Sequence, residues 1–147
     1  MTVFIFGKTG QLGEQLYIQG IKRNHKVAGF SHDELDITDR AKTEKTIKKV
    51  KPDVVLNATA FHVVPECELY PDKAFLVNTI AVRDLTQICQ NLNVRFVHYS
   101  TDYIFDGKKG SLYVENDLPS PVQTYGVSKM AGEYMALAFN PKSIVIR

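Results

Sequence analysis

A tyrosine and a lysine stand four residues apart in the segment YGVSK, at Tyr125 and Lys129. If a helix begins nearby, this spacing puts both side chains on one face, with the phenol hydroxyl close to the ammonium group. A nearby ammonium group favours phenolate and lowers the phenol pKa from its ordinary value of about 10. The pair is therefore a candidate proton donor, and the ordinary alternative is two surface residues that share a helix face by chance.

A second candidate site is the glycine turn GKTGQLG, in which Gly7, Gly10 and Gly13 follow each other at intervals of three positions. It comes directly after the apolar run TVFIF and opens a helical pattern, which is the context that a dinucleotide-binding turn requires. Glycines let backbone N–H groups approach a pyrophosphate, which then rests at the positive end of the helix. The alternative is a tight turn without a ligand. This spacing of the glycines is seen in short-chain dehydrogenases and their extended relatives.

Short apolar runs alternate with helical patterns along the chain. The runs are rich in Val, Ile and Phe and predict strands at residues 2–6, 26–30, 53–58, 94–100 and 143–147. Between them lie helical stretches at about 11–22, 39–50, 71–91 and 124–140, and in the third of these apolar residues recur at three- and four-residue spacing. This alternation predicts an α/β fold, a Rossmann-type doubly wound parallel sheet with helices on both faces. The long irregular stretch 102–123 is typical of a functional or disordered loop.

Composition restricts the class of protein. With 147 residues, 44% hydrophobic and 23% charged, the chain has the size of one domain, residues 1–147. A net charge of +2 is too small to indicate nucleic acid binding, and the basic run KTEKTIKKVK is better explained as the solvated face of a helix, with Ile47 and Val50 turned inward. We expect no signal peptide, no membrane span, reduced cysteines and a cytoplasmic location. His62 and Cys67 do not make a complete ligand set, so no metal is expected.

Five segments together resemble the N-terminal half of the dTDP-4-dehydrorhamnose reductase family, which belongs to the extended short-chain dehydrogenases: FGKTGQLGEQL, LDITD, KPDVVLNATA, VHYSTDYIFDGKKG and PVQTYGVSKMAGE. They occur in the family's order and cover nearly the whole chain. The resemblance implies an oxidoreductase of dTDP-rhamnose biosynthesis that uses NADPH or NADH. Its substrate would be a nucleotide sugar of the dTDP-4-dehydro-6-deoxy-L-mannose class, reduced at the 4-keto group.

The resemblance also assigns roles to residues. It implies that Tyr125 is the general acid, that Lys129 is its electrostatic partner and a ligand of the nicotinamide ribose, and that the Thr101 hydroxyl holds the substrate carbonyl. A turn-capping hydroxyl is the ordinary alternative for Thr101. The cofactor-binding residues that the resemblance implies are Gly7, Thr9, Gly10, Gln11, Leu12, Gly13, Ser31, Asp36, Ile37, Asn57, Ala58, Ala60, Ser100, Tyr125 and Lys129.

Three departures from the family pattern bear on function. The segment HVVPECE at 62–68 is less polar than in many relatives, which leaves the particular sugar open. Phe30 stands where an NAD-preferring domain often presents an acid to the ribose; this favours NADPH, although no arginine is present and Asp33 or Glu34 could serve NADH. Family members also continue beyond this length, so we expect a fragment that binds dinucleotide and turns over little substrate. Such a fragment would leave a sheet edge and an apolar face uncovered, which favours self-association, for example as a homodimer.

Two alternatives come from other classes of protein. The regulatory beta subunit of methionine adenosyltransferase has this fold and similar SDYVFDG and YGxxK segments, and would make the chain a dinucleotide-binding interaction module without catalysis. A related nucleotide-sugar epimerase or dehydratase would keep the same tyrosine and lysine. The retained Thr101, Tyr125 and Lys129 favour the reductase over the first alternative, and the STDYIFDG segment favours it over the second.

Overall fold

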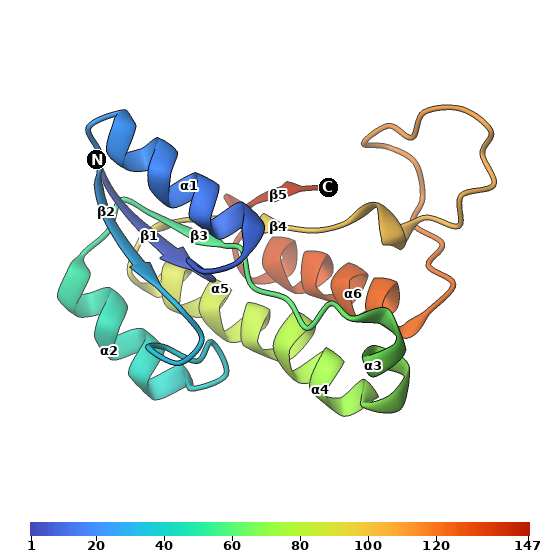
Figure 1. Cartoon of the computed structure of the whole chain (residues 1–147), viewed down its shortest axis with the longest axis horizontal. Helices are drawn as coiled ribbons and strands as arrows, with labels where there is room; N and C mark the ends of the chain where they lie inside the picture. The colour runs from blue at the N-terminus through green and yellow to red at the C-terminus, as the bar shows by residue number, and fades with distance from the viewer.

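The computed structural model describes all residues, 1–147, and is built around a five-stranded parallel sheet with the order β2-β1-β3-β4-β5 (Figure 1). The expected Rossmann-type α/β fold is confirmed. The strands are β1 (Thr2–Phe6), β2 (Lys26–Phe30), β3 (Val54–Asn57), β4 (Arg95–Tyr99) and β5 (Ile144–Ile146). Each lies within a range that the sequence predicted. All carboxyl ends point to the same edge of the sheet, where ligands bind in folds of this kind.

Helices cover the two faces of the sheet unequally. Helix α1 (Gln11–Lys22) packs against β1 and β2 on one face, while α2 (Arg40–Val50), α5 (Ala81–Asn91) and α6 (Thr124–Phe139) lie on the other (Figure 1). The sheet has a hydrophobic cluster on each face, and the side chains of β1 alternate between them. Val3 and Ile5 pack toward α1, and Phe4 and Phe6 join the larger cluster under α2, α5 and α6. A continuous apolar strand is therefore required at this position.

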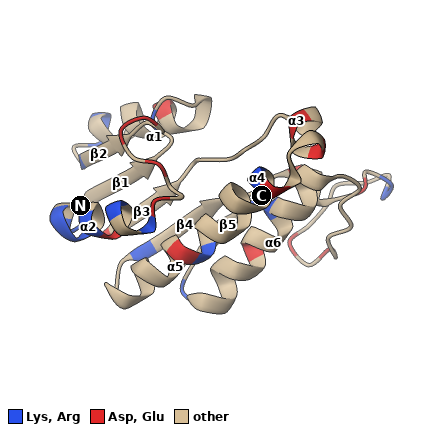
Figure 2. Ribbon diagram, turned by 90° about the horizontal axis from the view of Figure 1, so that it is seen from below, with Lys and Arg blue, Asp and Glu red and all other residues tan.

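The basic run at 42–51 falls on α2 as expected. Figure 2 shows Lys and Arg along this helix, and its inner side is held by Ile47, which is fully buried, and by Val50, which packs against the core. No helix of the structure is long and apolar enough to span a membrane.

Two local elements differ from the sequence prediction. The expected helix at 71–91 consists of α4 (Pro71–Phe75), the π-helical segment η1 (Leu76–Ile80) and α5, and the segment HVVPECE forms a short helix, α3 (Val64–Leu69). Pro65 lies in the first turn of α3 and Pro71 in the first turn of α4, positions where proline has no hydrogen bond to lose. The segment after the short helix η2 (Asp102–Ile104) has no further regular structure until α6 and extends from the body of the molecule in Figure 1.

Strand β5 lies at one edge of the sheet and exposes apolar side chains. Register places Ile144 beside Val97 and Ile146 beside Tyr99, so both isoleucines are on the α1 side of the sheet, which α1 covers only at β1 and β2. They are 46% and 44% exposed. The expectation of an uncovered edge and apolar face is met by this geometry, and association of two copies stays a prediction.

Candidate functional site

A cavity of about 800 Å³ opens at the carboxyl ends of β1, β2 and β3. It is large enough for a cofactor or drug-sized ligand. Its lining consists of Gly7, Thr9, Gly10, Gln11, Leu12, His32, Leu35, Asp36, Ile37, Ala58, Thr59, Ala60, Phe61, His62, Val77 and Tyr125. The glycine turn and the candidate proton donor, which are more than a hundred residues apart, therefore border one cavity.

The glycine turn is held by close backbone approaches that only glycine permits. Gly7 has φ +80°, and a Cβ atom there would lie 2.9 Å from the carbonyl oxygen of Ala58. A Cβ atom at Gly13 would lie 1.9 Å from the carbonyl oxygen of Gly7. Gly10, which precedes α1, provides no side-chain cap, so the first N–H groups of this 12-residue helix are not satisfied by a capping side chain. The turn thus fits a pyrophosphate at the start of the helix.

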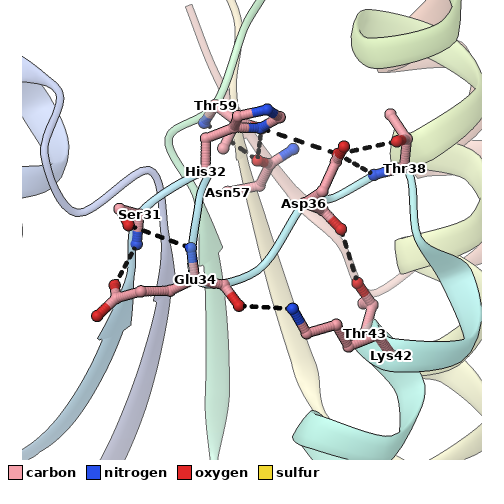
Figure 3. Close-up of polar contacts among 9 residues, drawn as sticks. All are labelled: Ser31, His32, Glu34, Asp36, Thr38, Lys42, Thr43, Asn57 and Thr59. Atoms are coloured by element: carbon pink, nitrogen blue, oxygen red, sulfur yellow. Dashed lines mark hydrogen bonds and ion pairs between the residues drawn. The ribbon is translucent and has the colours of Figure 1, made fainter.

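An acidic side chain stands at the end of β2 (Figure 3). The Ser31 amide donates to Glu34 Oε2 at 2.8 Å, and Lys8 Nζ lies 3.0 Å from the same oxygen. These hydrogen bonds, first from the Ser31 amide and then from Lys8, lower the pKa of Glu34 to about 2. Glu34 is therefore a carboxylate at neutral pH, about 20 residues beyond the glycine turn, where dinucleotide-binding domains place the acid that contacts the ribose.

Asp36 lies further along the same connection and is fixed by its neighbours. Its Oδ1 accepts hydrogen bonds from the backbone amide and hydroxyl of Thr38, both at 2.8 Å, and His32 Nδ1 is 3.9 Å away (Figure 3). Asp36 and the following Ile37 both line the cavity. This placement is compatible with contacts to the adenine end of a dinucleotide.

Tyr125 lies at the start of α6, half-buried, with its ring at the cavity. Burial raises the pKa of its phenol, and the Thr101 side chain acts in the opposite direction. Thr101 also has the turn-capping role that was its ordinary alternative. Its hydroxyl accepts a hydrogen bond from the Tyr103 amide at 3.2 Å and caps η2. The two sequence interpretations of Thr101 are therefore compatible.

Lys129 is buried one turn further along α6. The side chain is 1% exposed; Nζ donates to the carbonyl oxygen of Tyr99 at 2.6 Å and lies 3.4 Å from His98 Nε2. Burial lowers the Lys129 pKa to about 8, although the charge of Glu133 acts in the opposite direction. The expectation that this ammonium lowers the phenol pKa was wrong for this structure: Lys129 is directed toward β4, and burial is the largest influence on Tyr125.

Some of the remaining predicted residues line the cavity and others do not. Thr9, Gln11, Leu12, Ala58 and Ala60 are in its lining with the glycines, whereas Gly13, Ser31, Asn57, Ser100, Thr101 and Lys129 are not. The side chain of Asn57 is fully buried, and the Ser100 hydroxyl is buried without a hydrogen-bond partner.

Sequence reasoning did not place six lining residues in the cofactor site: His32, Leu35, Thr59, Phe61, His62 and Val77. Their only sequence signal was position: all but Val77 lie within five residues of the end of a predicted strand, and Val77 lies in the predicted helix 71–91. No three His, Cys, Asp or Glu side chains are grouped so that they could hold a metal ion. The thiol of Cys67 instead donates to the Phe61 carbonyl at 3.3 Å.

The buried imidazole of His98 gives an expected pH dependence of stability. Burial, together with the nearby charge of Lys129, holds the His98 pKa well below its ordinary 6.5. Below pH 6.5 the unfolded chain therefore binds a proton that the folded chain does not, and stability falls as the pH falls. We expect a contribution of up to about 1.4 kcal/mol per pH unit to the free energy of unfolding below that pH. Urea unfolding between pH 5 and 7 should show this slope, reduced in His98→Gln; equal slopes in both proteins would contradict it.

Comparison with known proteins gives one family match and three similar proteins. Residues 1–147 match the family described as RmlD substrate binding domain. A probable low-salt glycan biosynthesis reductase of Haloferax volcanii is 35% identical over 100% of this chain and 52% of its own length. The crystal structure of a dTDP-4-dehydrorhamnose reductase from Clostridium acetobutylicum has a TM-score of 0.94 and 34% identity over 99% of this chain and 52% of that chain.

The dTDP-4-dehydrorhamnose reductase of Bacillus anthracis, whose crystal structure is a complex with NADP, has a TM-score of 0.93 and 30% identity over 98% of this chain and 51% of that chain. This chain therefore spans about half the length of these relatives.

Proposed function

The chain belongs to the family of the RmlD substrate binding domain, and from that premise we propose that it is the dinucleotide-binding half of a dTDP-sugar reductase. The reaction would be reduction of the 4-keto group of a dTDP-linked 6-deoxysugar with NADPH or NADH. The observation that supports this most directly is that Tyr125 and the glycine turn line one cavity. A proton donor at one end and a pyrophosphate cradle at the other match what a nicotinamide-dependent ketone reduction needs.

Each residue of the site would have its own role in cofactor binding or proton transfer. The dinucleotide, when bound, supplies the hydride. Gly7, Gly10 and the start of α1 hold its pyrophosphate, and Tyr125 gives its phenolic proton to the oxygen of the reduced carbonyl. The Thr101 hydroxyl would hold the substrate carbonyl oxygen near the proton donor. Lys129 would bind the nicotinamide ribose.

The substrate half of the site would come from outside these 147 residues. The relatives are about twice as long as this chain. We therefore expect the chain alone to bind dinucleotide while turning over little or no nucleotide sugar. Robust steady-state reduction of a dTDP-4-keto-6-deoxysugar by the 147 residues would refute this part of the proposal.

A titration with NADPH and NADH, followed by nicotinamide fluorescence, tests the proposal and the cofactor preference together. Glu34 and Lys8 bear opposite charges at the end of β2, so the carboxylate should favour the ribose hydroxyl of NADH and the ammonium the 2′-phosphate of NADPH. We expect Glu34→Gln to tighten NADPH binding about tenfold relative to NADH because one repulsion is removed. Lys8→Gln should weaken NADPH binding more than NADH binding.

The matched control is Glu44→Gln, because Glu44 is also an exposed glutamate paired with a lysine, but it lies on α2 and not in the connection that follows β2. Its NADPH to NADH ratio should equal that of wild type. An unchanged ratio in Glu34→Gln would remove Glu34 from cofactor selection. Failure of wild type to bind either dinucleotide would instead contradict the proposed function of this chain.

A further inference from the structure

Three buried polar side chains form a row that crosses β3, β4 and α6. His98 of β4 is fully buried between Asn57 of β3, its direct neighbour in the sheet register, and Lys129 of α6. Its Nδ1 lies 3.2 Å from Asn57 Nδ2, and its Nε2 lies 3.4 Å from Lys129 Nζ. Both ring nitrogens therefore face protein groups, and the protonation of each is determined by what it faces.

The orientation of the Asn57 amide is fixed by the backbone (Figure 3). The Thr59 amide donates to Asn57 Oδ1 at 3.1 Å, and the Thr59 hydroxyl donates to the same atom at 2.7 Å. A backbone N–H group can only donate, so the atom that it meets is the oxygen of the side-chain amide. The NH₂ group of Asn57 is consequently the group that faces His98.

That orientation determines the tautomer of His98. An amide NH₂ group can only donate, so His98 Nδ1 must accept and carry no proton. A neutral imidazole then has its proton on Nε2, the nitrogen beside Lys129. If Lys129 is an ammonium group, two donors face each other at this contact. If Lys129 is a neutral amine, its lone pair accepts from Nε2–H while one of its own N–H groups donates to the Tyr99 carbonyl.

We propose that Asn57 and His98 are positioning residues for Lys129: Asn57 fixes His98 as the Nε2–H tautomer, and that N–H group favours the neutral form of the Lys129 amine. The catalytic meaning of this arrangement rests on the proposed function, whereas the tautomer and the Lys129 titration do not. In the reductase, the row would set the pH at which Lys129 gains its charge.

Other groups around Lys129 also act on its charge. Glu133, on the same helix, favours the ammonium form, but its carboxylate is also paired with Arg147, whose Nη2 lies 2.8 Å from Glu133 Oε2. The side chains of η1 that bond α6 are Asn78 and Thr79, which are uncharged. Burial acts in the same direction as His98. The experiment must therefore separate the effect of the imidazole from that of burial.

Two variants of this chain make that separation. In His98→Gln, the flexible side-chain amide can turn its oxygen to the Lys129 ammonium group, which the fixed imidazole cannot do. In His98→Phe, the site stays buried and offers no acceptor. We expect the Lys129 pKa, followed by NMR at the lysine Cε in the absence of ligand, to rise by about one unit or more in His98→Gln and to stay low in His98→Phe. An equal pKa in wild type and His98→Gln would show that burial alone sets it and would overturn the proposal.

The tautomer itself is measured in wild type by long-range ¹H–¹⁵N correlation of the His98 ring near neutral pH, so the test does not depend on whether a variant folds. The Nε2–H form is expected; the Nδ1–H form or an imidazolium would overturn the proposal. In the longer reductase, His98→Gln should move the pH profile of kcat in the direction of the Lys129 shift, which a purely structural role would not do. Absence of reductase activity in wild type would contradict the proposed function and leave both NMR results valid.

Discussion

Replacement of Tyr125 by phenylalanine is expected to lower kcat for reduction of a dTDP-4-keto-6-deoxysugar by about 10² to 10⁴, the usual contribution of a positioned proton donor. The assay requires the longer protein that we propose contains this chain. Only the hydroxyl is removed, and the ring that borders the cavity remains, so dinucleotide affinity should change by no more than about threefold. Steady-state kinetics and a fluorescence titration of the same preparation measure the two quantities.

Tyr103→Phe is the matched control for this experiment. The Tyr103 ring meets the Tyr125 ring edge-on at a centroid distance of 5.8 Å, but Tyr103 is not in the cavity lining. Its variant should keep most of the activity. Full activity in Tyr125→Phe would show that another group donates the proton. A wild-type protein that binds dinucleotide and has no activity to lose would favour the regulatory, noncatalytic alternative.

The pH dependence of proton donation by Tyr125 should differ from that of a tyrosine whose pKa is lowered by a neighbouring lysine. Burial raises the pKa of Tyr125 and lowers that of Lys129 to about 8, so in the unliganded chain the phenol stays protonated and the lysine is the group that changes charge near neutral pH. Sequence spacing placed both residues on one helix face, and it could not show where the lysine amine points. That direction is set by the Tyr99 carbonyl, thirty positions earlier in the chain.

The sheet was predictable from sequence because its signal is local. Strands covered on both faces are apolar at nearly every position, as in TVFIF, and the glycine turn directly follows the first of them. The helix α3 was not predicted, since six residues that include Pro65 give too short a pattern. The π-helical segment η1 was also missed. There Asn78 exchanges two hydrogen bonds with Phe61 and donates another to Ser128, and partners so distant in sequence leave no periodic trace.

The close approach of α1 to the turn after β1 should make the protein sensitive to substitution of Gly13. Alanine is ordinarily better than glycine inside a helix by about 1 kcal/mol. At Gly13 we expect the opposite, because the added Cβ atom would lie 1.9 Å from the Gly7 carbonyl oxygen and 2.7 Å from its carbon. These are backbone atoms that cannot rotate away. Gly13→Ala should lower the free energy of unfolding by about 2 kcal/mol or more, which urea unfolding would measure.

Gly10→Ala separates this close approach from the general effect of adding a methyl group to the turn. Gly10 has φ −77° and ψ 161°, a conformation open to alanine, and its Cβ atom would lie 3.4 Å from the Gly7 oxygen. Its stability should stay within about 1 kcal/mol of wild type. If both variants lose equal stability, the turn is sensitive to any side chain and the contact of Gly13 with Gly7 has no special importance. If only Gly13→Ala is destabilised, and it also binds dinucleotide at least tenfold more weakly, one contact fixes both the packing of α1 and the shape of the pyrophosphate cradle.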